Sequence, residues 1–273
     1  MSSIQYPISI DGALTRVIEA GSGPAVVFVH GLGARCDRWR GTVERFGAMG
    51  YRAITFDLPG HGLSQKHADA PSDVPAFARY LLGLMDALEL DSAVLVGTSL
   101  GGHISAYAAT LAPQRVGGLM LVGALGIAPL DAASAEGIRQ SVKATSREAI
   151  VRKLNAVIAD PSLITDALVT EEWRINNSPG ANECFVRVGN YLVDGIEHHY
   201  VAEQVAALYP PEKIRLVWGE LDKSVPLAVG TACQSLLGGP ELVLIPDAAH
   251  APYFERPAAF DPPLQAFLQS IQS

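Results

Sequence analysis

The sequence has few cysteines, no long apolar run and no excess of basic residues. Its 273 residues contain three cysteines, which are far apart and lack the spacing of metal ligands: Cys36, Cys184 and Cys233. So sparse a set argues against a disulfide framework and suits a reducing compartment, and we interpret the three as packing residues. The longest mostly apolar stretch, residues 117–130, is too short to cross a bilayer, and residues 1–10 lack the pattern of an export signal. We therefore expect a cytoplasmic protein that does not enter a membrane.

Acidic residues outnumber basic ones, 28 to 20, which gives a net charge of −8 and an isoelectric point near 5.3. Lysine and arginine form no stripe or cluster, so the composition argues against binding to nucleic acid. The 49% of hydrophobic residues can supply the core of one α/β domain with an insertion. We expect a small molecule as the binding partner, and a homo-oligomer is left open.

Short apolar runs alternate with helical patterns through residues 1–125 and again from residue 210. Such alternation predicts an α/β fold with a doubly wound, mostly parallel sheet. We expect strands at residues 14–19, 25–29, 53–56, 93–97, 118–122, 214–218 and 241–245. We expect helices near residues 38–46, 74–88, 100–111, 227–237 and 257–270.

The alternation stops between residues 126 and 209. This segment has helical patterns at residues 141–158, 163–175 and 183–192 and no convincing strand. We therefore predict a core made of residues 1–125 and 210–273, and a helical cap, residues 126–209, inserted after a strand.

Ser99 is the centre of a Gly-Thr-Ser-Leu-Gly pentapeptide, residues 97–101, between a predicted strand and a predicted helix. A serine on so sharp a turn takes a strained backbone, and the residues two before and two after it must be small because neighbouring chain passes close by. Gly97 and Gly101 meet this requirement. The spacing and its context are those of a nucleophile elbow, so Ser99 is the candidate nucleophile. The plainer interpretation is a glycine-rich turn that contains a serine.

Two backbone N–H groups are candidates for an oxyanion hole beside Ser99. Leu100 begins the helix after the turn, where its N–H has no intrahelical acceptor. Leu32 follows His30 and Gly31 in a loop directly after a predicted strand. We expect the N–H of Leu32 to complete the hole and His30 to shape the loop.

A serine nucleophile needs a base, and the base needs an acid that orients it. Asp222 and His250 each lie on a turn after a predicted strand. Because the carboxyl ends of parallel strands share one edge of a sheet, both can meet Ser99 despite their separation along the chain. Glu220 and Asp247 lie near the same turns and are the alternatives for the acid.

Together these features resemble the α/β-hydrolase fold superfamily of serine hydrolases, and the resemblance spans almost the whole chain. The residues that carry it are His30-Gly31, Asp57-x-Pro59-Gly60-x-Gly62-x-Ser64, the Ser99 elbow, Asp222 and His250. The chain order Ser, Asp, His also matches this fold. The resemblance implies an eight-stranded, mostly parallel sheet with a lid, and neither a cofactor nor a metal.

The substrate is the harder question, because this fold hosts several reactions on one triad. We expect cleavage of a small carboxylic ester or lactone through an acyl-enzyme. The alternative is a carbon–carbon bond hydrolase, since residues 164–179 are similar to the cap of the meta-cleavage-product hydrolases, which split vinylogous diketones formed from aromatic rings. That resemblance implies that Arg174 faces the substrate carboxylate, which a planar guanidinium suits. The other interpretation is a surface arginine paired with Glu171 or Glu172.

Two positions depart from the meta-cleavage family, which usually has asparagine before the nucleophile and tryptophan after the catalytic histidine. Here they hold Thr98 and Ala251. We expect Thr98 to contact the substrate and Tyr253 to form an apolar wall beside it, with core packing as the alternative for Tyr253. An acyltransferase and a ligand receptor without activity are the remaining hypotheses.

Overall fold

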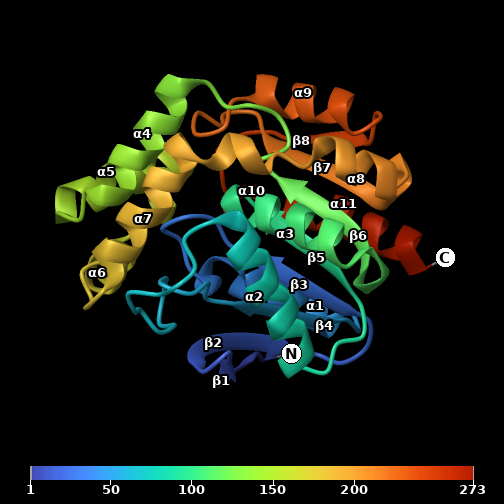
Figure 1. Ribbon diagram of the computed structural model, residues 1–273, viewed down its shortest axis with the longest axis horizontal. Helices are drawn as coiled ribbons and strands as arrows, with labels where there is room; N and C mark the ends of the chain where they lie inside the picture. The colour runs from blue at the N-terminus through green and yellow to red at the C-terminus, as the bar shows by residue number, and fades with distance from the viewer. Residues whose placement is uncertain (1, 273) are drawn as a thin grey trace.

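The computed structural model describes residues 2–272, which form an eight-stranded sheet with helices on both faces (Figure 1). The strand order is β1-β2-β4-β3-β5-β6-β7-β8. Every pair from β4 to β8 is parallel, whereas β2 runs antiparallel to both β1 and β4. The strands are β1 (Ile4–Ile10), β2 (Ala13–Ala20), β3 (Ala25–Val29), β4 (Arg52–Phe56), β5 (Ala93–Thr98), β6 (Val116–Val122), β7 (Ile214–Gly219) and β8 (Glu241–Ile245).

The predicted α/β class and mostly parallel eight-stranded sheet are confirmed. Strands β3 and β8 have the predicted bounds, and the other five predicted strands extend by one or two residues. Strand β1 had no counterpart in the sequence-based assignment. Its side chains are mostly exposed at the edge of the sheet and it contains Pro7, and proline within a run argues against a strand except at an edge.

Alternating side chains give the sheet two apolar faces. On β3, Val27 and Val29 pack with α2, α3, α8 and α9, while Val26 and Phe28 pack with α1 and α11. The helices are α1 (Arg40–Ala48), α2 (Val74–Ala87), α3 (Leu100–Leu111), α4 (Ala132–Lys143), α5 (Arg147–Val157), α6 (Asp166–Asn176), α7 (Ala181–Asp194), α8 (Ala202–Leu208), α9 (Leu227–Leu236), α10 (Pro252–Glu255) and α11 (Pro257–Gln272). Short 3-10 turns lie at Cys36–Trp39, Pro113–Arg115, Pro161–Leu163, Ile196–His199 and Pro211–Lys213.

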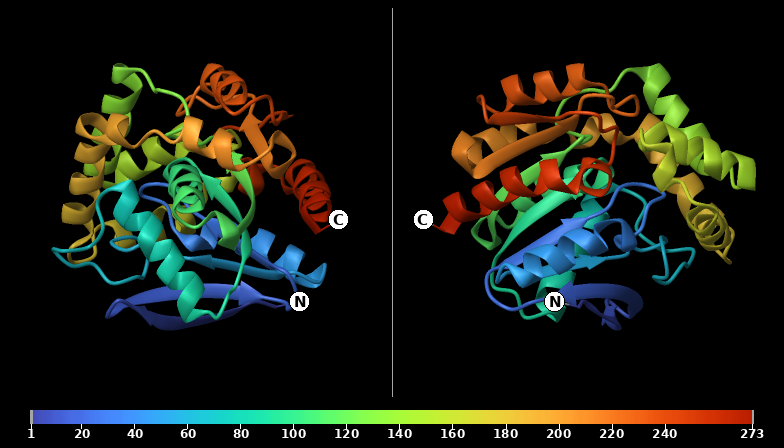
Figure 2. Two further views of the ribbon diagram at one scale, coloured as in Figure 1. Left: turned by 45° about the vertical axis from the view of Figure 1, so that its right-hand side comes forward. Right: turned by 180° about the vertical axis from the view of Figure 1, so that it is seen from behind.

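Helices α4 to α7 gather on one side of the molecule and project beyond the sheet (Figures 1 and 2). The segment predicted as one helix at residues 141–158 forms parts of two helices, α4 and α5, because residues 144–146 are not helical. Ser146 starts α5 by accepting a hydrogen bond from the N–H of Ala149. Helix α8, which also falls within residues 126–209, packs against α3 and α9. The division into core and cap stays a prediction.

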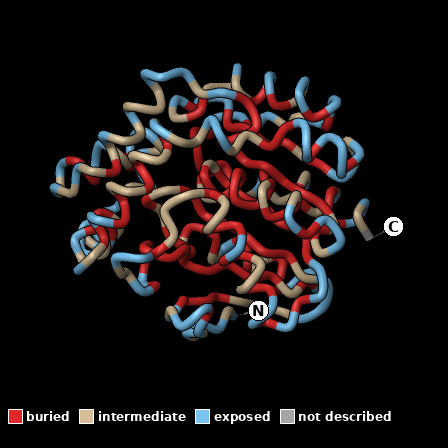
Figure 3. The backbone as a smooth tube through the Cα atoms, viewed as in Figure 1, coloured by how far each residue is buried: buried red, intermediate tan, exposed pale blue. Residues whose placement is uncertain are grey.

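Apolar contacts join helices α4 to α7 to the loops at the carboxyl ends of the strands. Leu32 packs against Val142 and Phe185, and Phe254 packs against the cluster that contains Leu154. The buried backbone runs through the sheet and the inner turns of the helices, whereas the outer turns are exposed (Figure 3). None of the helices within residues 2–272 has the combined length and hydrophobicity that a membrane crossing requires.

Candidate active site

Ser99 lies at the turn between β5 and α3, with φ 53° and ψ −122°. A positive φ is unfavourable for a residue that has a Cβ, so the packing around the turn must hold it. A Cβ on Gly97 would lie 2.2 Å from the carbonyl oxygen of Gly101, and a Cβ on Gly101 would lie 2.3 Å from that of Val29. Only glycine fits these two positions, and the pentapeptide forms a tight turn with Ser99 at its apex.

Asp222 and His250 lie on the loops that follow β7 and β8. His250 Nδ1 is 2.7 Å from Asp222 Oδ2. The other carboxylate oxygen of Asp222 accepts the N–H groups of Ser224 and Val225, each at 2.9 Å. Because a carboxylate only accepts, Nδ1 of His250 carries the proton and Nε2 is left as the basic nitrogen.

The alternatives for the acid are placed differently. Glu220 and Asp247 are exposed, whereas the Asp222 side chain is buried against the His250 ring. Burial by itself would lower the pKa of His250, but the Asp222 carboxylate, assisted by the charge of Glu255, raises it above its usual 6.5. Asp222 is therefore the acidic group that hydrogen-bonds and orients His250 in this structure.

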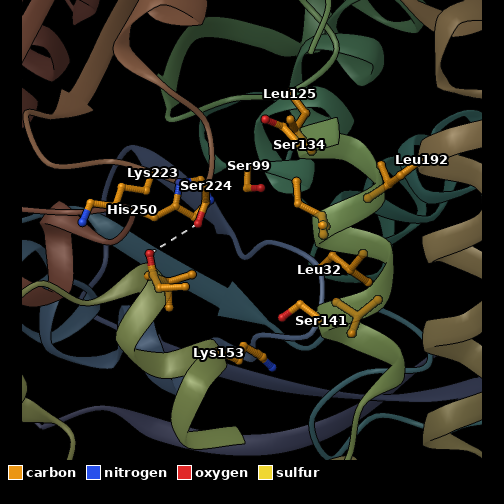
Figure 4. Close-up of a pocket in the computed structure, with 15 residues that line it drawn as sticks. Leu32, Ser99, Leu125, Ser134, Ser141, Lys153, Leu192, Lys223, Ser224 and His250 are labelled. Carbon is orange, nitrogen blue, oxygen red and sulfur yellow. Dashed lines mark hydrogen bonds between the residues drawn. The ribbon is translucent and has the colours of Figure 1, made fainter. Parts of the chain in front are cut away.

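Two cavities meet at Ser99 and His250. The larger has a volume of about 270 Å³ and a mostly apolar lining, drawn in Figure 4, which includes Leu125, Ile138, Val142, Val157 and Leu192. The smaller has a volume of about 70 Å³, and its lining includes Arg38, Thr98, Lys153, Ala251 and Tyr253. Ser99 and His250 line both cavities, so a ligand in either one reaches them.

The loop after β3 lies against Ser99. A Cβ on Gly31 would lie 3.0 Å from Ser99 Cβ, and the next residue, Leu32, lines both cavities. Leu100 is the first residue of α3, where the helix leaves backbone N–H groups without an intrahelical acceptor. The structure therefore brings Leu32 and Leu100 together beside the Ser99 side chain.

A family model for the alpha/beta hydrolase fold matches residues 24–257. The chain belongs to the alpha/beta hydrolase fold family. Among its relatives is the 2-hydroxy-6-oxo-6-phenylhexa-2,4-dienoate hydrolase of Burkholderia cepacia, 30% identical over 254 residues that cover 89% of this chain and 87% of that protein. The dihydrolipoyllysine-residue acetyltransferase component of the acetoin cleaving system of Pseudomonas putida is 29% identical over 264 residues, 95% of this chain and 68% of that protein.

A solved structure shows the same fold over the whole molecule. The 2-hydroxy-6-oxo-6-phenylhexa-2,4-dienoate hydrolase from Rhodococcus sp. strain RHA1 superposes with a TM-score of 0.88, covering 98% of this hydrolase and 99% of that chain, at 22% sequence identity. At this identity the likeness establishes the shared architecture.

Arg174 is not where the sequence-based expectation placed it. Its side chain is exposed and lines neither cavity. The buried face of α6 carries Val169, Glu172 and Asn176, and a residue two positions after Glu172 points to the opposite side of a helix. The alternative of a surface arginine has the observed placement but not the observed pairing, because Glu171 and Glu172 bind Arg35 and Arg38 in this hydrolase.

Thr98 and Tyr253 do lie at the site, and their predicted contact with substrate stays a prediction. Both are buried and line the smaller cavity. The ring of Tyr253 stacks on Trp39, with centroids 3.5 Å apart and planes at 10°. Tyr253 therefore packs in the core on one side and borders the cavity on the other.

Glu255 is a residue that sequence reasoning missed. It is 5% exposed, and its Oε1 accepts the N–H of Ala249 at 2.9 Å, directly before His250. Its Oε2 accepts the N–H of Ala159, just after α5, at 2.5 Å. The sequence does contain one signal for this role, because Glu255 is an acidic residue directly after the apolar residues that follow His250.

His30 and Asp57, two polar residues that carry the resemblance to the hydrolase superfamily, have structural roles in this hydrolase. His30 Nδ1 donates to the carbonyl oxygen of Gly31, which leaves Nε2 to accept the N–H of Leu58 at 2.9 Å. Asp57 is buried and accepts hydrogen bonds from Arg16, at 2.7 Å, and from the N–H of Leu63. These contacts fix the loops that follow β3 and β4.

No group of three or more His, Cys, Asp or Glu side chains within residues 2–272 is arranged to hold a metal ion. The three cysteines are buried and unpaired, and burial raises the pKa of Cys233 to about 11. Buried thiols are poor nucleophiles, which leaves Ser99 as the candidate nucleophile.

Proposed function

We propose that this hydrolase cleaves a carbon–carbon bond next to a carbonyl group in a dienoate, with Ser99, His250 and Asp222 as its catalytic triad. The observation that carries the proposal is the 30% identity to the Burkholderia dienoate hydrolase over nearly the full length of both chains. The geometry agrees with it, because Ser99 and the oriented His250 share two cavities. This alternative is better supported than the ester or lactone hydrolysis that the sequence favoured.

The proposed reaction has two stages. His250 accepts the proton of Ser99 as the serine oxygen adds to the ketone carbon, and the N–H groups of Leu32 and Leu100 bind the oxyanion. The adjacent carbon–carbon bond then breaks, and its electron pair passes to the conjugated fragment, which takes a proton from His250. Water, deprotonated by His250, finally splits the acyl-enzyme into a carboxylic acid and free Ser99.

The two cavities suit the two parts of such a substrate. The mostly apolar cavity of about 270 Å³ can take the apolar group on the far side of the ketone. The smaller cavity takes the part on the other side of the bond that breaks. In this proposal helices α4 to α7, within the predicted cap of residues 126–209, cover the reacting carbonyl.

Ester hydrolysis is the second candidate, and one observation favours it. Thr98 and Ala251 line the smaller cavity at the positions where the meta-cleavage hydrolases usually have asparagine and tryptophan. An aryl ester needs neither of those side chains, since an alkoxide or phenoxide leaves without the help that a carbon leaving group requires. Acyl transfer would use the same acyl-enzyme with a different acceptor.

Turnover of two substrates by the purified protein tests the proposal. A coloured meta-cleavage dienoate and a neutral short-chain aryl ester are compared side by side, each with the Ser99→Ala variant as control. We expect a larger kcat/KM for the dienoate and loss of both activities in Ser99→Ala. A clear preference for the ester would favour the second candidate, and binding without turnover of either substrate would favour a receptor.

A further inference from the structure

Three cations surround one buried carboxylate at the edge of the smaller cavity. Glu172, on α6, is 2% exposed. It accepts a hydrogen bond from Arg38 Nη2 at 2.9 Å, and Arg35 Nε lies 3.8 Å from the same oxygen. Burial by itself would raise the pKa of Glu172, but the charges of Arg38, Lys153 and Arg35 lower it below its usual value. Glu172 is therefore ionised, and its negative charge compensates several cations at once.

The positive charge at this edge exceeds the negative charge. Arg38 pairs with Glu172, and Arg35 pairs with Glu171 at 2.6 Å. Lys153 makes no ion pair of hydrogen-bond length within the part of the chain that the structure describes. Its ammonium donates instead to the carbonyl oxygen of Gly33, at 2.5 Å. An ammonium has three donors, so Lys153 keeps capacity for a ligand.

Arg38 has a buried donor without a hydrogen-bond partner. The residue is 8% exposed and lines the smaller cavity. Its Nη1 is buried and finds no hydrogen-bond partner among residues 2–272. A buried donor without an acceptor is unfavourable, and more so when it is charged. The Arg38 guanidinium therefore adds positive charge to the wall of the smaller cavity.

The described residues that line the two cavities include Arg38, Lys153 and Lys223 but no aspartate or glutamate, although the chain as a whole carries a net charge of −8. We propose that the smaller cavity is a carboxylate subsite, in which the Lys153 ammonium binds the anionic end of the substrate and the charge of Arg38 in the cavity wall attracts it. An ammonium forms charge-assisted hydrogen bonds to carboxylate oxygens. A volume of about 70 Å³ has room for a carboxylate group.

This inference rests on the proposed function and adds the residues that select its substrate. The part of the substrate that ends in the carboxylate lies in the smaller cavity, and the apolar group beyond the ketone lies in the larger one. Ser99, which lines both cavities, then lies between the two ends of the substrate, where its carbonyl must be. Lys153, shown on α5 in Figure 4, and Arg38 take the role that the sequence resemblance gave to Arg174.

Binding of a stable dienoate separates the subsite from catalysis. Sorbate and its neutral amide share a carbon skeleton and differ in charge. Calorimetric titration of the Ser99→Ala protein should show sorbate binding about 10-fold tighter than the amide or more. Adding Lys153→Met should weaken sorbate binding roughly 10-fold to 100-fold and leave amide binding unchanged. Lys153→Arg should restore most of the preference.

Two further variants separate the subsite from general effects of charge and folding. Arg152→Met removes the same charge from the exposed side of α5 and should leave both affinities unchanged. Arg38→Met combined with Glu172→Met removes the arginine together with its buried partner, so no carboxylate is left uncompensated. This double variant should weaken the preference for sorbate while retaining a cooperative thermal transition.

The outcomes distinguish the subsite from the proposed reaction. Equal binding of sorbate and its amide to the Ser99→Ala protein, or an unchanged preference after Lys153→Met, would overturn the subsite. A preference that depends on Lys153, found in a protein that turns over no dienoate, would support the subsite and contradict carbon–carbon bond hydrolysis.

Discussion

Glu255 holds the loop of His250 against the segment that follows α5. One carboxylate oxygen accepts the N–H of Ala249 and the other accepts the N–H of Ala159. The N–H of His250 in turn donates to the carbonyl oxygen of Val157, at 3.2 Å. The position of the proposed base is therefore tied directly to the helices that cover the cavities.

Glu255→Gln should move the pH dependence of activity. His250 acts as a base only when neutral, so kcat/KM falls as the pH drops through its pKa. Because Asp222 and Glu255 raise that pKa, the acid limb of the wild type should have its midpoint above 6.5. Removing the Glu255 charge should shift the midpoint to lower pH. An unchanged midpoint in a variant of normal thermal stability would contradict this role for Glu255.

Asp222→Asn should reduce kcat by about four orders of magnitude with little change in fold. The asparagine amide keeps the size of the side chain but favours the wrong tautomer of His250. The measurement is kcat for the better of the two substrates, with circular dichroism as the control for folding. A loss smaller than about 10-fold would argue that another group orients His250.

Gly97→Ala should destabilise the protein by at least about 1–3 kcal/mol, because the added methyl group would clash with backbone atoms that cannot move aside. The added Cβ would lie 2.2 Å from the carbonyl oxygen of Gly101. Gly137→Ala is the matched control: on α4 the added Cβ meets no atom within 4 Å, and it should stabilise by about 0.5–1 kcal/mol. Urea denaturation of both variants measures the two free energies of unfolding. Equal stability of the two variants would contradict the packing of the elbow.

Arg174→Ala should leave KM unchanged both for the dienoate and for a neutral ester. The side chain is exposed on α6 and lines neither cavity. Steady-state kinetics on the two substrates give the comparison. A KM that rises for the carboxylate-bearing substrate alone would indicate that Arg174, and not Lys153, binds the substrate carboxylate.

Sequence patterns located the parallel strands, and with them the residues at their carboxyl ends. Ser99, Asp222 and His250 each follow a short, fully apolar run, and parallel strands place such residues at one edge of the sheet. For these three residues, the pattern of the strand and of the turn after it was enough to predict their position. Strand β1 was not predicted, because it is exposed at an edge of the sheet and Pro7 interrupts its apolar pattern.

The substrate side of the site could not be predicted in the same way. Arg174 and Glu172 lie on α6, and Lys153 lies on α5. On a helix, a shift of the assigned inner face by one residue exchanges a buried side chain for an exposed one. Glu172 is buried because Arg35 and Arg38, from a loop far away in the sequence, compensate its charge. Such pairing depends on the tertiary structure and leaves no local signal.

The most direct test of carbon–carbon bond hydrolysis at Ser99 is an analysis of the products formed from a meta-cleavage dienoate in water labelled with heavy oxygen. The account predicts two products, a carboxylic acid that carries one oxygen from water and a shorter conjugated acid, and no cleavage by Ser99→Ala. Two results would contradict the account. One is a dienoate that stays intact with wild-type protein that hydrolyses aryl esters, and the other is cleavage that persists in Ser99→Ala.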